Sequence, residues 1–328
     1  MTKINITNNL FGSSSQFKSP HSIVQFNIDS QLNEQPDALF LSYFSIDIHE
    51  KILESDMMQK LPIYLSKEAF ELKQQFALLG KISETHLNYK IIPINTALTI
   101  GDFTVIAFLS DSIYTGSLAF LVEDEMQKQA FLAGDTRLAG PHKKRTKKWI
   151  HDLNRLPLDV LILNTVNMID TNYYTEITVL DHLIKLLKVE ELTAVNVANE
   201  NLYLIHKLAT MAKKLDKIIA LDKTTYQLLT YFYPDTEVIS LNEDTSVSIK
   251  RHPEKYILVN IENELGDFNL STQNTYSLTD LLENNNNSLP INSHLSSLEV
   301  PELLNRLTHK PKKLILIDPN FDNTIVTY

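Results

Sequence analysis

The chain has 328 residues, a formal net charge of -10 at pH 7, 43% hydrophobic residues and no cysteine. This length predicts one large domain or two interlocked domains with sizeable cores. The acidic charge argues against broad nonspecific attraction to nucleic acid phosphates. The absence of cysteine excludes disulfides, thiolate zinc sites and cysteine nucleophiles, so any metal site must use His, Asp or Glu.

Residues 1–21 lack the apolar core of a signal peptide, and no apolar run in the sequence reaches about 18 residues. We therefore predict a cytoplasmic protein that does not insert into a membrane.

Apolar runs of strand length alternate with helical patterns, which indicates an α/β fold. A buried strand at 38–44 leads into an apparent helix start, and a strand at 61–66 leads into a helix at 66–80. Ser66 is placed to cap that helix and Gly80 to end it. Further strands are predicted at 89–95, 103–109, 117–123, 128–134 and 158–164.

From Thr171 the sequence changes to longer alternations of helix and strand. The first of these helices, at 178–191, carries an apolar stripe of the kind that packs on a sheet, formed by Leu180, Leu183, Ile184 and Leu187. The asparagine-rich segment 281–294 predicts a boundary loop. A helix at 296–307 and a final buried strand at 310–320 follow.

The sequence contains seven glycines and no GxGxxG, GxxxxGK[ST] or GxSxG pattern, which disfavours ordinary dinucleotide, P-loop and serine-hydrolase sites. One short run is strongly basic: Lys143, Lys144, Arg145, Lys147 and Lys148. Such a run holds an acidic ligand in some proteins and is a solvated helix face in others.

The segments "LFLSYFSIDIHEKI", "LPIYLSKEAFELK", "GDFTVIAFLSDSIYTGSLAFLV", "AFLAGDTRLAG", "DVLILNT" and "NSHLSSLEVPELLNRLTHKPKKLILID" resemble successive segments of the metallo-β-lactamase superfamily. The similarity is greatest to its β-CASP branch, which includes the RNase J type ribonucleases. The central segment from "TAVNVANENLYLIHK" to "LDKTTYQLL" is similar to the inserted β-CASP domain.

This resemblance implies a four-layer αβ/βα sandwich formed by residues 1–168 and 288–328. A β-CASP-like α/β domain would be inserted at 169–287. Members of the family use two metal ions, usually zinc or manganese, to activate a water molecule.

Aligned on the family's HxHxDH motif, this chain has Tyr43, Ser45 and Ile48 at the three histidine positions, and only Asp47 remains. The other metal-ligand positions of the family fall on Asp111, Asp135, His294 and Asp318.

A two-metal site needs roughly four to five ligands per metal. The five candidate ligands are four carboxylates and one imidazole, and they suffice for one Mn²⁺, Mg²⁺ or Zn²⁺ ion at most. We therefore expect no cofactor, with a single metal ion as the alternative.

Each candidate also has an ordinary structural interpretation. Asp47 is placed to cap the following helix and Asp111 to shape a loop. Asp135 is placed either to pair with Arg137 or to satisfy backbone donors in a tight loop. His294 lies in a polar loop and Asp318 in a turn. Of the histidines outside the motifs, His49 is one residue out of register, and His182 and His206 lie within predicted helices.

Ser45 and Ser112 have no base at a spacing typical of a nucleophilic serine.

Two function classes remain open. The first is a catalytically silent RNase J-like homologue that binds RNA or a protein partner, with the basic run beside the pocket. The second is a divergent metal-dependent phosphodiesterase or ribonuclease. The family often forms dimers, so the resemblance also leaves a homodimer open.

Overall fold

The computed structural model describes residues 2–327 apart from 10–11, 29–33, 84–85, 166–175, 189–190, 199, 262–264, 273, 280–287, 291–294 and 318–323. The chain divides into two compact units. Unit 1 comprises Met1–Tyr173 and Asn292–Tyr328, and unit 2 comprises Tyr174–Ile291. Each unit is described by itself below.

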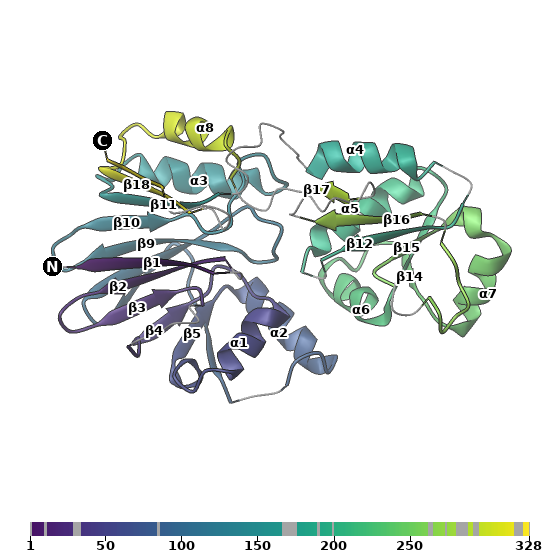
Figure 1. Ribbon diagram of the computed structural model, residues 1–328, viewed down its shortest axis with the longest axis horizontal. Coiled ribbons are helices and arrows are strands. Elements are labelled where there is room, and N and C mark those ends of the chain that lie inside the picture. Colours follow the sequence, from purple (N-terminus) through teal and green to yellow (C-terminus); the bar gives the residue numbers. More distant parts are fainter. Residues whose placement is uncertain are drawn as a thin grey trace. The chain divides into compact units, whose positions relative to one another are not determined.

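The described residues of unit 1 form two sheets, and the first is a six-stranded sheet in chain order (Figure 1). It is antiparallel from β1 to β3 and parallel from β3 to β6. Its strands are β1 (Lys3–Asn9), β2 (Gly12–Lys18), β3 (Ile23–Phe26), β4 (Ala38–Phe40), β5 (Pro62–Leu65) and β6 (Asn88–Ile91).

The second sheet of unit 1 has seven strands among the described residues, in the order β19-β18-β11-β10-β9-β8-β7. Strands β10, β11 and β18 are parallel to one another, and β9 runs against them. The strands are β7 (Ala97–Ile100), β8 (Phe103–Leu109), β9 (Leu118–Asp124), β10 (Gln129–Leu132), β11 (Val160–Asn164), β18 (Lys313–Ile317) and β19 (Thr324–Thr327).

Strand β9 shows how the layers are built. Side chains alternate between the two faces of a strand. Leu118, Phe120 and Val122 pack between the two sheets, beside Phe26 of the first sheet. The intervening Leu121 faces the helices on the outer side. Both faces of this sheet are therefore apolar and covered.

Helices cover the outer faces of both sheets (Figure 1). On the first sheet these are α1 (Ile46–Leu53) and α2 (Lys67–Leu78), and on the second α3 (Lys143–Leu153) and α8 (Glu299–Arg306). The short helix η1 (Met58–Lys60) follows α1. Trp149 of α3 packs on Phe131 of β10, with ring centroids 4.8 Å apart. Unit 1 is thus an αβ/βα sandwich, and the predicted α/β fold class is confirmed.

Unit 2 is built on a parallel sheet, which has six strands among the described residues, in the order β14-β13-β15-β12-β16-β17. Its strands are β12 (Thr193–Val197), β13 (Ile218–Leu221), β14 (Val238–Ser240), β15 (Tyr256–Val259), β16 (Asn274–Thr279) and β17 (Ser288–Pro290). Its helices are α4 (Glu176–Leu186), α5 (Leu202–Lys213), α6 (Lys223–Phe232), α7 (Glu243–Arg251) and η2 (Pro253–Lys255).

The sheet of unit 2 is buried on both faces, as parallel sheets are. Ala194 and Leu258 form a core with Ile249 of α7. The neighbouring residues Val195 and Ile257, which face the other way, are also fully buried. Helices α4, α5 and α6 account for the long helical patterns that the sequence shows after Thr171. The kinship of unit 2 to the β-CASP domain remains a prediction.

The predicted ends of helix α2 agree with the structure: the Ser66 hydroxyl accepts a hydrogen bond from the Ala69 amide at 3.0 Å, and Gly80 follows the helix with φ +65°. Strands β1 to β3, β7, β15 to β17 and β19 and helix α7 were not predicted. No helix in the described part of the chain combines the length and hydrophobicity needed to cross a bilayer.

Candidate functional site

The candidate residues gather at one edge of the second sheet of unit 1. Strands β8 and β10 both run antiparallel to β9, so their last residues lie at the same edge. Asp111 follows β8 and Asp135 follows β10. Asn164 ends β11, which is parallel to β10. Two of the loops that resemble metal-ligand segments, those of Asp111 and Asp135, therefore meet at this edge, beside the end of β11.

Tyr43, at the first histidine position of the motif, is buried and stacks on Tyr114. The two ring centroids are 3.9 Å apart and the ring planes differ by 10°. Tyr114 belongs to the loop that follows β8, so this aromatic pair joins two of the loops that resemble metal-ligand segments. It fills space beside the strand ends with apolar surface.

The rest of this motif begins helix α1. The Ser45 hydroxyl accepts a hydrogen bond from the Ile48 amide at 3.2 Å and caps the helix. Ile48 is buried. Asp47 lies in the first turn with an exposed side chain. The interpretation of Asp47 as the cap was therefore wrong, because Ser45 has the extended backbone that a capping residue needs.

Asp111 forms a buried ion pair with Arg137. The guanidinium Nη2 lies 3.4 Å from Oδ1 of Asp111, and the two side chains are 6% and 0% exposed. The Arg137 amide also donates to the Asp111 carbonyl oxygen at 2.8 Å. A Cβ atom added to Gly140 would lie 2.4 Å from the same Oδ1, so this carboxylate is packed tightly on the backbone of its neighbour.

Asp135 is also buried, but its carboxylate Oδ1 accepts a hydrogen bond from Nδ2 of Asn164 at 2.8 Å. A pairing of Asp135 with Arg137 stays a prediction, and Arg137 forms a buried ion pair with Asp111. Gly134, directly before Asp135, has φ +62°, a conformation that glycine adopts without strain. The turn at Gly134 places the Asp135 carboxylate within hydrogen-bond distance of Asn164, the last residue of β11.

Two residues near this loop were missed by sequence reasoning. Glu299 is 2% exposed, and its Oε1 accepts a hydrogen bond from the Leu138 amide at 2.8 Å. Its Oε2 accepts one from the Ser296 amide at 3.1 Å. The spacing of Ser296 and Glu299 is that of a capping box, a signal that would have placed Glu299 at a helix start.

His142 is the second missed residue. Burial, followed by the positive charges of Arg145 and Arg137, lowers the pKa of His142 to about 4. His142 is therefore a neutral imidazole near pH 7.

Three other histidines were considered in the sequence analysis. His49 is buried, and its Nδ1 lies 2.9 Å from the hydroxyl of Tyr89. Burial and the charge of Lys73 lower the pKa of His49. In unit 2, Nδ1 of His206 lies 2.7 Å from the hydroxyl of Thr236, and His182 is exposed.

His294 and Asp318 lie outside the described residues, so their place is not stated. Among the residues that the structure does describe, no three His, Cys, Asp or Glu side chains are grouped to hold a metal ion. The described donors also do not fit the family's two-metal centre. Asp111 faces a guanidinium, whose charge repels a cation, and Tyr43 and Ile48 stand at histidine positions.

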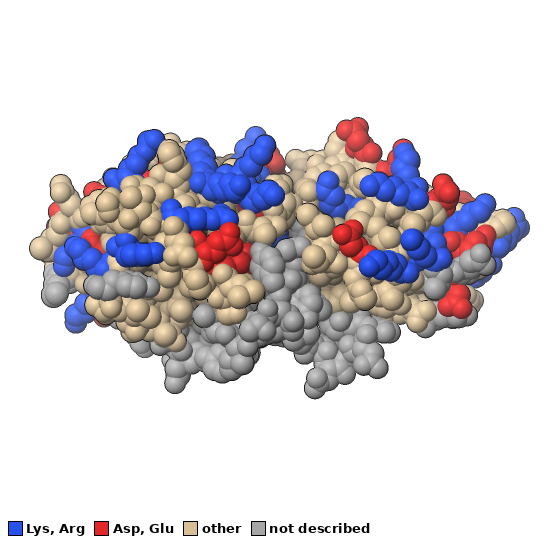
Figure 2. Space-filling view, turned by 90° about the horizontal axis from the view of Figure 1, so that it is seen from above, with Lys and Arg blue, Asp and Glu red and all other residues tan. Residues whose placement is uncertain are grey.

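The basic run forms the exposed side of helix α3. Lys143, Lys144, Lys147 and Lys148 are exposed, while Trp149 is 1% exposed and anchors the opposite side. We call these four lysines the α3 lysine face. Figure 2 looks onto this side of unit 1 and shows Lys and Arg side chains gathered over α3 and α8.

Helix α3 is fixed beside the candidate site. The Thr146 hydroxyl donates to the Arg137 carbonyl oxygen at 3.2 Å. Arg145 lies 3.2 Å from Glu68 at the start of α2. An open groove of about 420 Å³ lies along α3, where Lys147 and Arg306 are among its lining residues. Helix α3, which carries the basic surface, is therefore tied to the loop that carries Arg137.

Comparisons with protein-family models and with curated protein sequences gave no match. A crystal structure of an Enterococcus faecalis V583 protein of unknown function is similar over 96% of this chain and 93% of that chain, with 13% identity and a TM-score of 0.70. At this identity the similarity shows a shared fold.

Metallo-β-lactamase fold structures match about half of the chain. The YhfI protein of Bacillus subtilis has 16% identity over 51% of this chain and 72% of that chain, with a TM-score of 0.38. A metallo-β-lactamase from Staphylococcus aureus has 14% identity over 48% and 53%, with a TM-score of 0.35.

Proposed function

We propose that this protein is a catalytically silent relative of the RNase J type metallo-β-lactamase/β-CASP proteins, and that it binds RNA through the α3 lysine face. The observation that carries the proposal is the buried ion pair between Asp111 and Arg137. It stands at a position where the resemblance implies a histidine bound to a metal ion.

The ion pair opposes metal binding at Asp111 for an electrostatic reason. A divalent cation beside Asp111 would meet the charge of Arg137 in a site that water does not screen. Moving Arg137 away would leave its guanidinium to find another partner in a loop where its side chain is 6% exposed. Both changes cost free energy, so the pair favours a site without a metal at Asp111.

The aromatic pair of Tyr43 and Tyr114 supports the same conclusion. Stacked rings 3.9 Å apart leave no room between them for a ligand. The two ring faces in that contact are closed to a nucleotide base. RNA binding would therefore depend on charge.

The α3 lysine face has the geometry for phosphate contacts. Lys143 and Lys147, and Lys144 and Lys148, are each four residues apart and so lie in two rows along the helix. All four are exposed and are anchored through the buried Trp149. Lysines placed this way neutralise successive phosphates with little sequence preference. The net charge of -10 restricts such binding to this local surface.

A second candidate is a metal-dependent phosphodiesterase that uses a reduced, carboxylate-rich site with one Mn²⁺, Mg²⁺ or Zn²⁺ ion. The observation that favours it is the buried carboxylate of Asp135, which meets Asn164 at the strand ends. A hard ion of this kind would be held there by carboxylate oxygens. In this case Asp135 would be required for both metal binding and RNA cleavage.

The test is a salt titration of single-stranded RNA binding, followed by fluorescence anisotropy. The variant Lys144→Glu/Lys148→Glu removes two of the proposed phosphate contacts. The control variant Lys60→Glu/Lys81→Glu changes two exposed lysines elsewhere in unit 1 and alters the net charge by the same amount. We expect the first variant to lower the steepness of log K against log salt by about 1.4, since each contact with a single strand contributes about 0.7. The control should keep the wild-type slope.

Equal losses in both variants would contradict the α3 lysine face as the RNA site. Wild-type protein that does not bind RNA at low salt would move the proposal to a protein partner. Cleavage of the RNA in the presence of Mn²⁺, abolished by Asp135→Ala, would establish the phosphodiesterase instead.

A further inference from the structure

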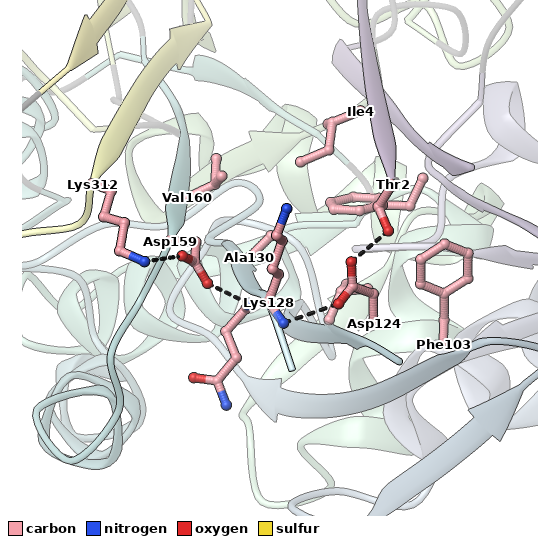
Figure 3. Close-up of a pocket in the computed structure, with 12 residues that line it drawn as sticks. Thr2, Ile4, Phe103, Asp124, Lys128, Ala130, Asp159, Val160 and Lys312 are labelled. Carbon is pink, nitrogen blue, oxygen red and sulfur yellow. Dashed lines mark hydrogen bonds and ion pairs between the residues drawn. The ribbon is translucent and has the colours of Figure 1, made fainter. Parts of the chain in front are cut away.

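A cavity of about 400 Å³ lies in unit 1, away from the candidate site (Figure 3). It sits where β8, β10, β11 and β18 begin, whereas Asp111 and Asp135 follow the ends of β8 and β10. Strand β8 alone has seven residues, which at about 3.4 Å per residue separates its two ends by roughly 20 Å. This cavity is therefore distinct from the strand ends discussed above.

The walls of this cavity are apolar and come from both sheets. They are formed by Ile4, Phe17, Phe103, Val122, Ala130 and Val160. The rings of Phe17 and Phe103 meet edge to face with centroids 6.4 Å apart. The cavity volume lies within the range of about 300–1,000 Å³ that is typical of small-molecule sites. The space suits an aliphatic or aromatic group.

Two aspartates at the rim have partners from the chain. Asp124 accepts hydrogen bonds from the amides of Met126 and Lys128, both at 2.9 Å, and from the hydroxyl of Thr2. Asp159 accepts one from the Gln129 amide at 2.9 Å. These contacts hold the two carboxylates against the backbone of the turn.

Asp159 is also neutralised by a lysine. Nζ of Lys312 lies 2.6 Å from Asp159 Oδ1. Burial opposes ionisation of Asp159, but the hydrogen bond from Lys312 and the nearby positive charges lower the pKa of Asp159 overall. The charge of Lys312 is therefore engaged within the protein.

Lys128 differs from Lys312. Its side chain lines the cavity between Asp124 and Asp159 (Figure 3), and its ammonium forms no ion pair with the residues that the structure describes. The rim thus has two carboxylates with dedicated donors, one lysine paired with Asp159, and Lys128, whose exposed side chain has no ion-pair partner among the described residues. The charge of Lys128 also helps to lower the pKa of Asp159.

We propose that this cavity binds a small carboxylic acid with an apolar tail, such as a medium-chain fatty acid, whose carboxylate pairs with Lys128 while its tail packs on Phe17, Phe103 and Val122. Transfer of the apolar tail out of water contributes favourable binding free energy. The ion pair with Lys128 favours a ligand whose head group is negatively charged. This inference is independent of the RNA-binding proposal, because it uses neither the α3 lysine face nor the loop of Asp111.

The test compares three probes with the same tail and different heads: octanoate, octan-1-ol and octylammonium. Binding is followed in methyl NMR spectra through Ile4, Val122 and Val160, whose methyl groups line the cavity. Ile150 of α3 is the control methyl, because it lies outside this cavity. We expect octanoate to shift the three cavity methyls and to bind at least about fivefold more tightly than octylammonium.

Two variants separate the roles of charge and space. Lys128→Met keeps an apolar stem and removes the charge, so it should weaken octanoate about fivefold and leave octan-1-ol within a factor of two. Lys81→Met, at an exposed lysine elsewhere in unit 1, should change neither probe. Val160→Phe fills the cavity from a half-buried position and should abolish binding of both probes. Fluorescence of Trp149 verifies that each variant is folded.

Three results would overturn the proposal. Octylammonium binding more tightly than octanoate would show that the negative charges of Asp124 and Asp159 outweigh the positive charge of Lys128 at the rim. Equal weakening of octanoate and octan-1-ol by Lys128→Met would assign Lys128 a packing role only. Octanoate that leaves the three cavity methyls unshifted would exclude this cavity as its site.

Discussion

Removing either partner of the ion pair between Asp111 and Arg137 is predicted to destabilise unit 1 by several kcal/mol. Arg137→Met removes the guanidinium that pairs with the Asp111 carboxylate, which is 0% exposed. Removing one partner of a buried pair costs about 3–5 kcal/mol, because the remaining charge is desolvated and uncompensated. We expect Asp111→Leu to cost a similar amount for the same reason.

The double variant Asp111→Leu/Arg137→Met removes both charges. The loss in free energy of unfolding for the double variant should be smaller than the summed losses of the two single variants by at least about 2 kcal/mol. The matched control is Arg145→Met, which breaks the pair with Glu68, whose side chains are 27% and 38% exposed. That change should cost under about 1 kcal/mol, because water screens the pair.

Urea unfolding followed by Trp149 fluorescence is a suitable assay. Trp149 is the single tryptophan of the chain and packs on Phe131 in unit 1. The signal therefore reports unit 1 without a contribution from unit 2, which lacks tryptophan. The reasoning is refuted if Arg137→Met costs no more than Arg145→Met, or if the two single costs add in the double variant.

Three further predictions concern the loops around this pair. Burial and nearby positive charge lower the pKa of His142 from 6.5 to about 4 on folding, so the unfolded chain binds more protons between these pH values. Stability should therefore fall as pH decreases through this window, by roughly 2 kcal/mol once screening of this partly exposed side chain by water is allowed for. His142→Gln should flatten that part of the stability profile, and an unchanged slope would argue against the shift. Gly134→Ala should cost at least about 2 kcal/mol, since φ is +62° and the new Cβ would lie 2.8 Å from the Leu118 carbonyl oxygen; urea midpoints check this. Tyr114→Ala should destabilise by about 1 kcal/mol more than Tyr114→Phe because only the ring stacks on Tyr43, and equal midpoints would contradict the stacking.

The sequence predicted those parts of the fold whose signals are local. Ser66 and Gly80 marked the ends of α2 because a capping hydroxyl and a left-handed glycine act within one turn. The α/β class followed from apolar runs such as "FTVIAFL", and the sandwich from the resemblance alone. Strand β2 was missed because its serines, among them the buried Ser14 and Ser15, are not typical of a strand core.

The site was less predictable because its contacts join residues far apart in the sequence. No spacing pairs Asp111 with Arg137, which are 26 residues apart, or Leu138 with Glu299, which are 161 apart. Tertiary packing determines which carboxylate Arg137 meets. The resemblance identified Asp111 and Asp135 as important positions, but their partners required coordinates.

The measurement that tests the silent-site proposal most directly is metal content by mass spectrometry. The protein would be purified without chelators and reconstituted with excess Mn²⁺ or Zn²⁺, beside Asp135→Ala as the control. We expect wild type and variant to retain the same substoichiometric amount of metal, because Arg137 neutralises Asp111 and the histidine positions hold Tyr43 and Ile48. One or more equivalents of metal in the wild type, lost in Asp135→Ala, would contradict the account and establish a metal centre at these strand ends.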